Sequence, residues 1–286
     1  MVTAFVLTGG ANLGAAQVGM LTALDEGGIT PDLVIGTSVG AFNGAWVAAG
    51  SDLTQLGDMW RSLRRRDLFP SRPVGGVLAI LGARDHVVDD SGLRRLLHDH
   101  LTFDRLERAP VPFHVVATDV LTGEGVLLSR GPAMESILAS AAIPGVRVLP
   151  TVRVDGRALM DGGVVNNAPI SHAVDLGADT IWVLATGYSC ALRSSPRSAL
   201  GVALHAATLV IHQRLASDVA TYSTSVDLRV VPPLCPLSVA PTDFSQGHSL
   251  IRRAYVTPNA GSTVAQPQAP VPTTGSARSR SIATIP

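Results

Sequence analysis

Short apolar runs alternate with stretches of helical periodicity along most of the chain. The apolar runs predict strands at 4–8, 33–35, 112–120, 126–128, 180–186 and 227–231. The periodic stretches predict helices that include 18–24, 39–46, 93–101, 131–143, 196–222 and 242–255. Strands that are apolar throughout are typical of parallel sheets, because helices bury both faces of such sheets. The pattern therefore predicts an α/β domain of three layers, with a mostly parallel central sheet and helices on both faces.

The domain organisation follows from length and local composition. A chain of 286 residues is long enough for one large α/β domain. After residue 257 the sequence consists largely of Pro, Ser, Thr, Ala and Gly, and it contains no acidic residue. A segment of this composition has too little apolar surface to bury for stable folding. We expect one folded domain over 1–257 and a low-complexity, disordered tail over 258–286.

Composition and charge argue against several classes of protein. Hydrophobic residues make up 46% of the chain and charged residues 15%, which supports a large core. The formal net charge is zero, so nothing indicates a nucleic-acid partner. Cys190 and Cys235 match no metal-ligand spacing and no disulfide framework, and we expect free thiols and neither a metal nor a cofactor.

The N-terminus and the apolar runs predict where the protein resides. The first strand begins without the basic region of a signal peptide. No apolar run reaches the length of about 18 residues that a membrane helix needs. We expect a cytoplasmic protein, either free or peripherally associated with a membrane.

The segment 33–46 carries the first candidate for chemistry. Residues 36–40, GTSVG, form a G-x-S-x-G pentapeptide between an apolar run and a helical pattern. In a nucleophile elbow, the serine lies on a sharp turn from strand to helix, and flanking glycines such as Gly36 and Gly40 leave room for neighbouring backbone. Ser38 would then project at the positive end of the helix. The alternative is an ordinary N-cap serine, but the strand before it and the helix after it favour a nucleophile.

A glycine loop follows the first predicted strand. The loop 9–14, GGANLG, leads into a helix, and such loops aim backbone N–H groups at an anion. A nucleotide phosphate is one candidate anion, but a dinucleotide site needs G-x-G-x-x-G and an acid that ends the second strand, whereas Asp32 precedes it. The other candidate is the oxyanion of an acyl-transfer intermediate. An oxyanion hole at Gly9, Gly10 and Ala11 explains this loop and the serine elbow together, whereas a nucleotide site explains only the loop.

Two runs of residues carry a family resemblance. The run 7–19, LTGGANLGAAQVG, and the run 31–40, PDLVIGTSVG, resemble the opening of the patatin-like phospholipases of bacterial type. The resemblance implies a patatin-like α/β fold and a serine acyl hydrolase that cleaves lipid esters with a Ser-Asp dyad and without a catalytic histidine. The family's loop reads G-G-G-x-[KR]-G, whereas this chain has Ala11 at the third glycine and Leu13 at the basic position. We expect the oxyanion hole to survive this change if φ of Ala11 is negative.

The resemblance extends to an acidic motif. Asp161 lies at the end of a predicted strand, and together with Gly162 and Gly163 it looks like the D-G-[GA] motif that carries the family's catalytic aspartate. D-G-G alone is a common turn, but here it follows the glycine loop and the elbow in the family's order. We expect Asp161 to act as the general base for Ser38, with a pKa raised by burial beside an apolar acyl pocket. The glycines expected to support the three motifs are Gly14, Gly36, Gly40, Gly162 and Gly163.

Alternatives to this interpretation remain open. One is a Ser-Asp-His triad, for which the chain offers His172, His205, His212 and His248. Others are a nucleotide-binding α/β protein and a non-catalytic relative that binds lipid. The partner expected for the hydrolase is a lipid or another acyl ester, and the acyl donor can be a phospholipid, a neutral glyceride or a thioester.

Three further segments carry weaker signals. The stretch 59–70, MWRSLRRRDLFP, combines arginines with apolar residues as at a lipid interface, although we favour a surface helix and loop that cover the core. The glycine-rich run 75–82 is a candidate for lining or covering an acyl pocket. We expect Ser140 to allow close helix packing, and Asn166 and Asn167 to cap the following helix or support the D-G-G turn.

Overall fold

The computed structural model describes residues 1–68, 90–142, 152–186, 199–234, 239 and 243–255. Three of the features discussed above lie outside these residues: the run 75–82, the thiols of Cys190 and Cys235, and the tail 258–286. The boundary at residue 257 therefore stays a prediction.

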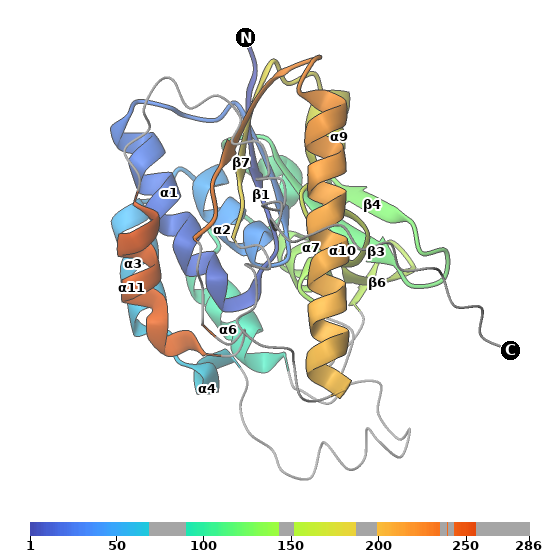
Figure 1. Cartoon of the computed structure of the whole chain (residues 1–286). Helices are drawn as coiled ribbons and strands as arrows, with labels where there is room; N and C mark the ends of the chain where they lie inside the picture. The colour runs from blue at the N-terminus through green and yellow to red at the C-terminus, as the bar shows by residue number, and fades with distance from the viewer. Residues whose placement is uncertain (69–89, 143–151, 187–198, 235–238, 240–242, 256–286) are drawn as a thin grey trace, which may run out of the picture.

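A single mixed sheet forms the centre of the molecule (Figure 1). Its strands follow the order β5-β6-β3-β2-β1-β7-β8, and β4 pairs with β3 off this path. The bounds are β1 (Thr3–Leu7), β2 (Leu33–Thr37), β3 (Phe113–Asp119), β4 (Gly125–Leu128), β5 (Val152–Val154), β6 (Arg157–Asp161), β7 (Thr180–Leu184) and β8 (Asp227–Val231). The pairings that run from β3 through β2, β1 and β7 to β8 are parallel, and those of β4, β5 and β6 are antiparallel. The predicted, mostly parallel sheet is confirmed, whereas strand β5 was not predicted.

Helices cover both faces of this sheet, as predicted. The α-helices are α1 (Gly14–Glu26), α2 (Val39–Ala48), α3 (Leu53–Ser62), α4 (Arg65–Leu68), α6 (Ser91–His100), α7 (Ala133–Ser140), α8 (Gly163–Asn166), α9 (Ile170–Asp175), α10 (Ala199–Tyr222) and α11 (Gly247–Ala254). The short 3-10 turns are η1 (Ala11–Leu13), η2 (Leu106–Arg108) and η3 (Phe244–Gln246). Within the described residues, no helix combines the length and the apolar character needed to cross a bilayer.

The alternation of side chains along β1 shows how the three layers are built. Phe5 and Leu7 point to one core, which contains residues of α1, α2, α3 and α11. Ala4 and Val6 point to the other core, which contains residues of α9 and α10. In Figure 1, α1, α3 and α11 accordingly lie on one side of the sheet and α10 on the other. Because both faces of the strand are covered, its residues are apolar throughout.

The bounds of α7 and α11 differ most from the prediction. Helix α7 ends at Ser140 instead of continuing to 143, and its C-cap residue Ala141, with φ −100° and ψ 3°, has left the helical conformation. The predicted helix 242–255 consists of η3 followed by α11. Asp243 initiates η3 by accepting a hydrogen bond from the Ser245 N–H at 3.0 Å.

Strand β3 is the place where the sheet changes direction. β4 pairs with positions 115–118 of β3, β2 pairs with positions 113–116, and β6 pairs with positions 117–119. A strand has only two edges, so β2 and β6 share the edge opposite β4. β6 therefore takes over this edge where β2 ends: Thr37 is opposite Val116, and Asp161 is opposite the next residue, Ala117. The register thus brings Asp161 next to the residue that follows β2, which is Ser38.

Candidate active site

Ser38 lies at the sharp turn between β2 and α2. Its backbone has φ 56° and ψ −124°, which is sparsely populated by residues other than glycine and costs roughly 1–3 kcal/mol. A Cβ atom at Gly36 would lie 2.5 Å from Cα of Ala41, and one at Gly40 would lie 2.8 Å from the Thr8 carbonyl oxygen. The two flanking glycines are therefore required by space, because strand and helix approach each other at this turn. The surrounding structure holds a strained serine at the start of a helix.

The side chains of Ser38 and Asp161 meet directly. The Ser38 hydroxyl donates a hydrogen bond to Oδ2 of Asp161 at 2.6 Å, across 123 positions of sequence. Oδ1 of Asp161 accepts the Gly163 N–H at 2.7 Å, and its carbonyl oxygen accepts the Thr118 hydroxyl at 2.9 Å. The hydroxyl and the carboxylate are thus in direct hydrogen-bond contact, whereas in a Ser-Asp-His triad an imidazole would lie between them.

The environment of Asp161 changes its acidity. Both Ser38 and Asp161 are buried. Burial raises the pKa of Asp161 from 3.8 to about 6, and the hydrogen bonds from Ser38 and Gly163 oppose the rise. Desolvation has this effect because it disfavours the charged form of a carboxyl group. The carboxylate is consequently a stronger base than an exposed aspartate, as the apolar surroundings in the sequence prediction imply.

Ser140 holds the backbone of the elbow. Its hydroxyl accepts the Ser38 N–H at 2.7 Å and donates to the Val116 carbonyl oxygen at 2.6 Å. Val116 lies opposite Thr37, the last residue of β2, so this second bond ties Ser140 to the place where both β2 and β6 end. The sequence analysis expected only close packing from Ser140, and the small residues of α7 were the signal that its helix approaches the site.

Two side chains orient the first peptide of the glycine loop. The Gly9 carbonyl oxygen accepts the Thr186 hydroxyl at 2.6 Å and the Asn167 amide at 3.4 Å. In a trans peptide the C=O and the following N–H point in opposite directions, so these bonds also set the direction of the Gly10 N–H. A Cβ at Gly9 would lie 3.0 Å from Cβ of Ser38, which shows how closely the loop approaches the serine.

The sequence analysis missed Thr186 and assigned Asn167 to another task. Thr186 follows β7, and no local motif marked it. Asn167 was expected to cap the next helix or support the turn; the N-cap position of α9 is Pro169, and the Asn167 amide bonds the glycine loop instead. Asn166 bonds Ser171 at 3.2 Å at the start of α9.

The backbone conformation of Ala11 differs from the negative φ that the sequence analysis expected for an intact oxyanion hole. Its φ is +52°, in the left-handed region, and not negative as expected. The turn demands this conformation: Leu13 N–H closes onto the Gly10 carbonyl oxygen at 3.0 Å, and η1 begins at Ala11. Alanine retains its N–H at a positive φ, so the conformation does not remove the donor from the loop, but alanine bears a steric cost that glycine would not. Leu13, at the family's basic position, packs against the core.

Replacing Ala11 with glycine is expected to stabilise the protein. Relief of the left-handed strain outweighs the extra entropy of glycine in the unfolded chain, for a net gain of about 0.5 kcal/mol in the free energy of unfolding. Urea denaturation measures the change. The matched control is Ala15→Gly in α1, where the same substitution should destabilise by about 1 kcal/mol. Equal destabilisation by both variants would contradict the assignment of strain to Ala11.

A buried polar chain links the loop to α3. Gln17 donates to the carbonyl oxygens of Thr8 and Leu184, each at 3.0 Å. Asn43 donates to Oε1 of Gln17 at 2.8 Å and to the Gly14 carbonyl oxygen at 3.0 Å. The Trp60 indole N–H then donates to Oδ1 of Asn43 at 2.9 Å. Buried polar groups that satisfy one another in this way rigidify their surroundings.

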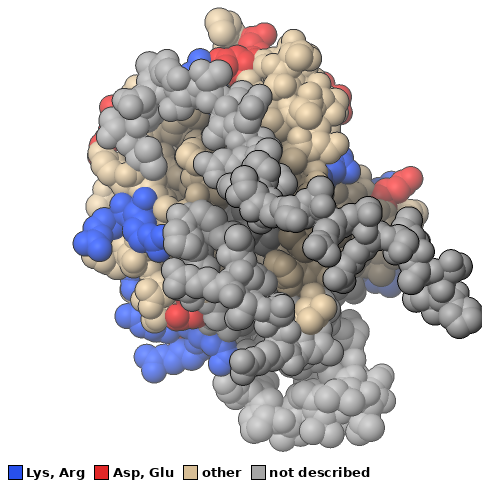
Figure 2. Space-filling view, in the orientation of Figure 1, with Lys and Arg blue, Asp and Glu red and all other residues tan. Residues whose placement is uncertain are grey.

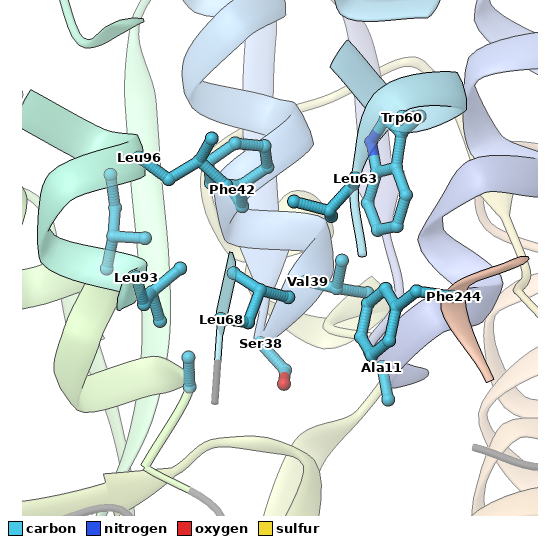
Figure 3. Close-up of a pocket in the computed structure, with 12 residues that line it drawn as sticks. Ala11, Ser38, Val39, Phe42, Trp60, Leu63, Leu68, Leu93, Leu96 and Phe244 are labelled. Atoms are coloured by element: carbon cyan, nitrogen blue, oxygen red, sulfur yellow. The ribbon is translucent and has the colours of Figure 1, made fainter. Parts of the chain in front are cut away.

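An apolar pocket opens above Ser38 (Figure 3). Its cavity volume is about 80 Å³, and the pocket is partly open to solvent. Figure 3 shows Ala11 and Phe244 on one side of Ser38 and Leu93 and Leu96 on the other. The lining consists of Ala11, Ser38, Val39, Phe42, Trp60, Leu63, Leu68, Leu93, Leu96, Ile137, Ala141 and Phe244. The serine hydroxyl is the polar group of an otherwise hydrophobic wall, as a site for an acyl chain requires.

The remaining predicted glycines lie at close contacts around this site. A Cβ at Gly14 would lie 2.9 Å from the Trp60 ring, and one at Gly10 would lie 2.7 Å from Cβ of Thr186. A Cβ at Gly162 would meet the backbone of Val116, and one at Gly163 would lie 2.9 Å from Oδ1 of Asp161. Every glycine of the three motifs therefore lies where a side chain would displace a neighbour.

Comparisons with known proteins give the family of the chain. The patatin-like phospholipase family model matches residues 5–174. An uncharacterized NTE family protein of Mycobacterium bovis is 35% identical over 180 residues, which is 62% of this chain and 46% of that protein. Patatin-like phospholipase domain-containing protein 6 of Homo sapiens is 30% identical over 187 residues, or 64% of this chain and 13% of that protein. Lysophospholipase nte1 of Aspergillus terreus is 30% identical over 194 residues, or 64% of this chain and 12% of that protein.

The chain spans less than half the length of these relatives. Among solved structures, VipD from Legionella pneumophila aligns with a TM-score of 0.41 and 14% identity over 88% of this chain and 67% of that chain. The family match covers more than half of the chain and contains the glycine loop, the elbow and Asp161. This chain belongs to the patatin-like phospholipase family.

Proposed function

We propose that this protein hydrolyses acyl esters of lipids, with Ser38 as the nucleophile and Asp161 as the general base. The observation that carries the proposal is the hydrogen bond of 2.6 Å from the hydroxyl of Ser38, which lines an apolar pocket, to the buried carboxylate of Asp161. A serine hydroxyl is a weak nucleophile until a base within hydrogen-bond reach takes its proton. Family membership supports a lipid hydrolase, and the identity of the two residues is the part we add.

The first half of the reaction forms an acyl-enzyme. Oγ of Ser38 attacks the ester carbonyl carbon while its proton passes to Oδ2 of Asp161. The carbonyl oxygen becomes an oxyanion, and we assign its stabilisation to N–H groups of the glycine loop at Gly9, Gly10 and Ala11. When the intermediate collapses, the C–O bond to the alcohol breaks, and the alcohol leaves with the proton from Asp161.

The second half regenerates the enzyme. Asp161 takes a proton from a water molecule, whose oxygen attacks the acyl carbon. Collapse of the second tetrahedral intermediate returns the proton to Ser38 and releases the fatty acid. The bonds from Thr186, Asn167 and Ser140 contribute by keeping the loop and the elbow in place through both halves, because a donor that is already oriented needs no reorganisation during the reaction.

Release of fatty acid by the purified protein tests the proposal. We expect a fluorophosphonate to label Ser38 and mass spectrometry to detect free acid from at least one of three donors: a phosphatidylcholine, a triacylglycerol and an acyl-coenzyme A. The donor that reacts fixes the substrate class. Lipid binding without labelling or release would favour the non-catalytic relative. A thermal shift with nucleotides and no labelling would favour the nucleotide-binding alternative.

A further inference from the structure

Two pocket-lining segments share a pattern of leucines that flank arginines. Leu63 and Leu68 line the pocket, and Arg64, Arg65 and Arg66 lie between them. In α6, Leu93 and Leu96 line the same pocket, and Arg94 and Arg95 lie between them. The chain therefore places charged groups beside the apolar wall twice, from the two separate segments 63–68 and 93–96.

These two segments are neighbours in space. A Cβ at Gly92 of α6 would meet the backbone oxygens of Asp67 and Leu68 of α4. Figure 2 shows basic side chains gathered at the lower left, the side on which Figure 1 places α4. We define the arginine rim as Arg64, Arg65, Arg66 and Arg95, all of them exposed.

The acidic groups near the rim neutralise little of its charge. Asp58 pairs with Arg61 at 2.7 Å, and both Asp90 and Glu135 pair with Arg94, at 2.8 and 3.7 Å. Asp67 lies 3.9 Å from Arg66 in an exposed pair, which contributes little. Within the part of the chain that the structure describes, Arg65 and Arg95 form no ion pair. The rim is thus positive although the formal net charge of the protein is zero.

We propose that the arginine rim docks the protein on an anionic lipid surface, with the pocket mouth facing the bilayer. The inference rests on the proposed function, since it gives the apolar pocket an acyl chain to receive. Arginine stems can lie along apolar surface while their guanidinium groups reach the phosphate layer. An anionic membrane surface attracts each nearby Lys or Arg by about 1 kcal/mol, which raises the affinity of the protein for the membrane roughly fivefold per residue. Docking at this rim delivers lipid to the side of the protein where Leu63, Leu68, Leu93 and Leu96 line the pocket.

Vesicle sedimentation of an arginine variant tests the docking. The variant is Arg65→Gln/Arg66→Gln/Arg95→Gln, which keeps Arg64 because its guanidinium caps the carbonyl oxygens of Arg61, Ser62 and Leu63 at the end of α3. The matched control is Arg130→Gln/Arg153→Gln/Arg157→Gln, three exposed arginines that do not line the pocket. The vesicles contain phosphatidylcholine alone or phosphatidylcholine with phosphatidylglycerol.

The expected pattern has four parts. Wild type binds vesicles with phosphatidylglycerol more tightly than vesicles without it, and added salt weakens this binding. The rim variant binds these vesicles about 100-fold more weakly than wild type, because each of the three replaced arginines contributes roughly fivefold to the affinity. The control variant loses much less. Turnover of a soluble nitrophenyl ester stays at the wild-type level in both variants, since neither changes the pocket lining.

Other outcomes overturn the docking. They are equal binding of wild type to both kinds of vesicle, equal losses in the rim and control variants, or an unchanged rim variant. Displacement from vesicles by soluble glycerophosphoglycerol at low concentration would assign the rim to a single headgroup and not to a surface. If wild type fails to hydrolyse any ester while the vesicle results hold, the proposed function fails and the docking stands.

Discussion

Replacing Ser38 with alanine is expected to lower kcat for ester hydrolysis by about 10⁴-fold or more, since the acyl-enzyme has no other oxygen on which to form. The change removes one hydroxyl and leaves the positive φ of the elbow in place, so the fold and the pocket persist. Nitrophenyl ester turnover and fluorophosphonate labelling both measure the loss.

Ser136→Ala is the matched control for this variant. Ser136 is also buried, and its hydroxyl donates at 2.8 Å to the carbonyl oxygen of Pro132, the N-cap residue of α7; Ser136 does not line the pocket. We expect it to cost about 1 kcal/mol of stability and to leave kcat near wild type. A Ser38→Ala enzyme with activity close to that of the control would remove Ser38 from the mechanism.

Replacing Asp161 with asparagine is expected to lower kcat by roughly 10²–10⁴-fold, the usual contribution of a general base. The amide can donate to the Ser38 oxygen but cannot accept its proton. In wild type, kcat should rise with pH through about 6, because only the carboxylate form of Asp161 is a base. The variant should lack this rise in its residual activity. A full rise in the variant would assign the titration to another group.

Asp161→Asn is also expected to stabilise the fold at pH values above the pKa of Asp161. Burial raises that pKa from 3.8 to about 6, so the folded state favours the protonated acid. This contribution to stability is fully present below the unfolded pKa and is lost as pH rises through the folded one. Asparagine resembles the protonated acid, and its side-chain oxygen can still accept the Gly163 N–H. The stability of the variant therefore does not fall as pH rises through the pKa of Asp161, as that of wild type does. We expect a gain on the order of 1–3 kcal/mol above pH 6 that disappears near pH 4.

Urea denaturation of wild type and variant on both sides of this pH range measures the difference. A variant less stable than wild type at alkaline pH would show that the carboxylate is not disfavoured in the fold. Lost activity together with increased stability is a combination that simple misfolding of the variant would not produce.

Much of the architecture could be predicted from local pattern. Helices cover both faces of the sheet, so strands such as 4–8 and 33–35 appear in the sequence as continuous apolar runs. Stretches of helical periodicity such as 39–46 form helices. Gly36 and Gly40 identified a turn in which strand and helix nearly touch. The order of the three motifs led to Ser38 and Asp161, although their catalytic roles are still proposals.

Other features depend on which segments meet. Nothing local to Asp161 says that β6 shares an edge of β3 with β2, yet this pairing places its carboxylate on Ser38. The hydrogen bonds of Ser140 and Thr186 also arise only when distant segments pack together. The positive φ of Ala11 likewise reflects the turn that η1 must make, and not the preference of alanine.

The sequence by itself determined the α/β class, the strands and helices of the core, the elbow and the glycine loop, because each depends on residues that are close together in the chain. Only the tertiary structure decided how Ser38 contacts Asp161 and which side chains support the loop, and the burial that it creates produces the raised pKa of Asp161 that the sequence led us to expect. These depend on strand pairing and on exclusion of water, and both arise from contacts between residues that are far apart in the chain.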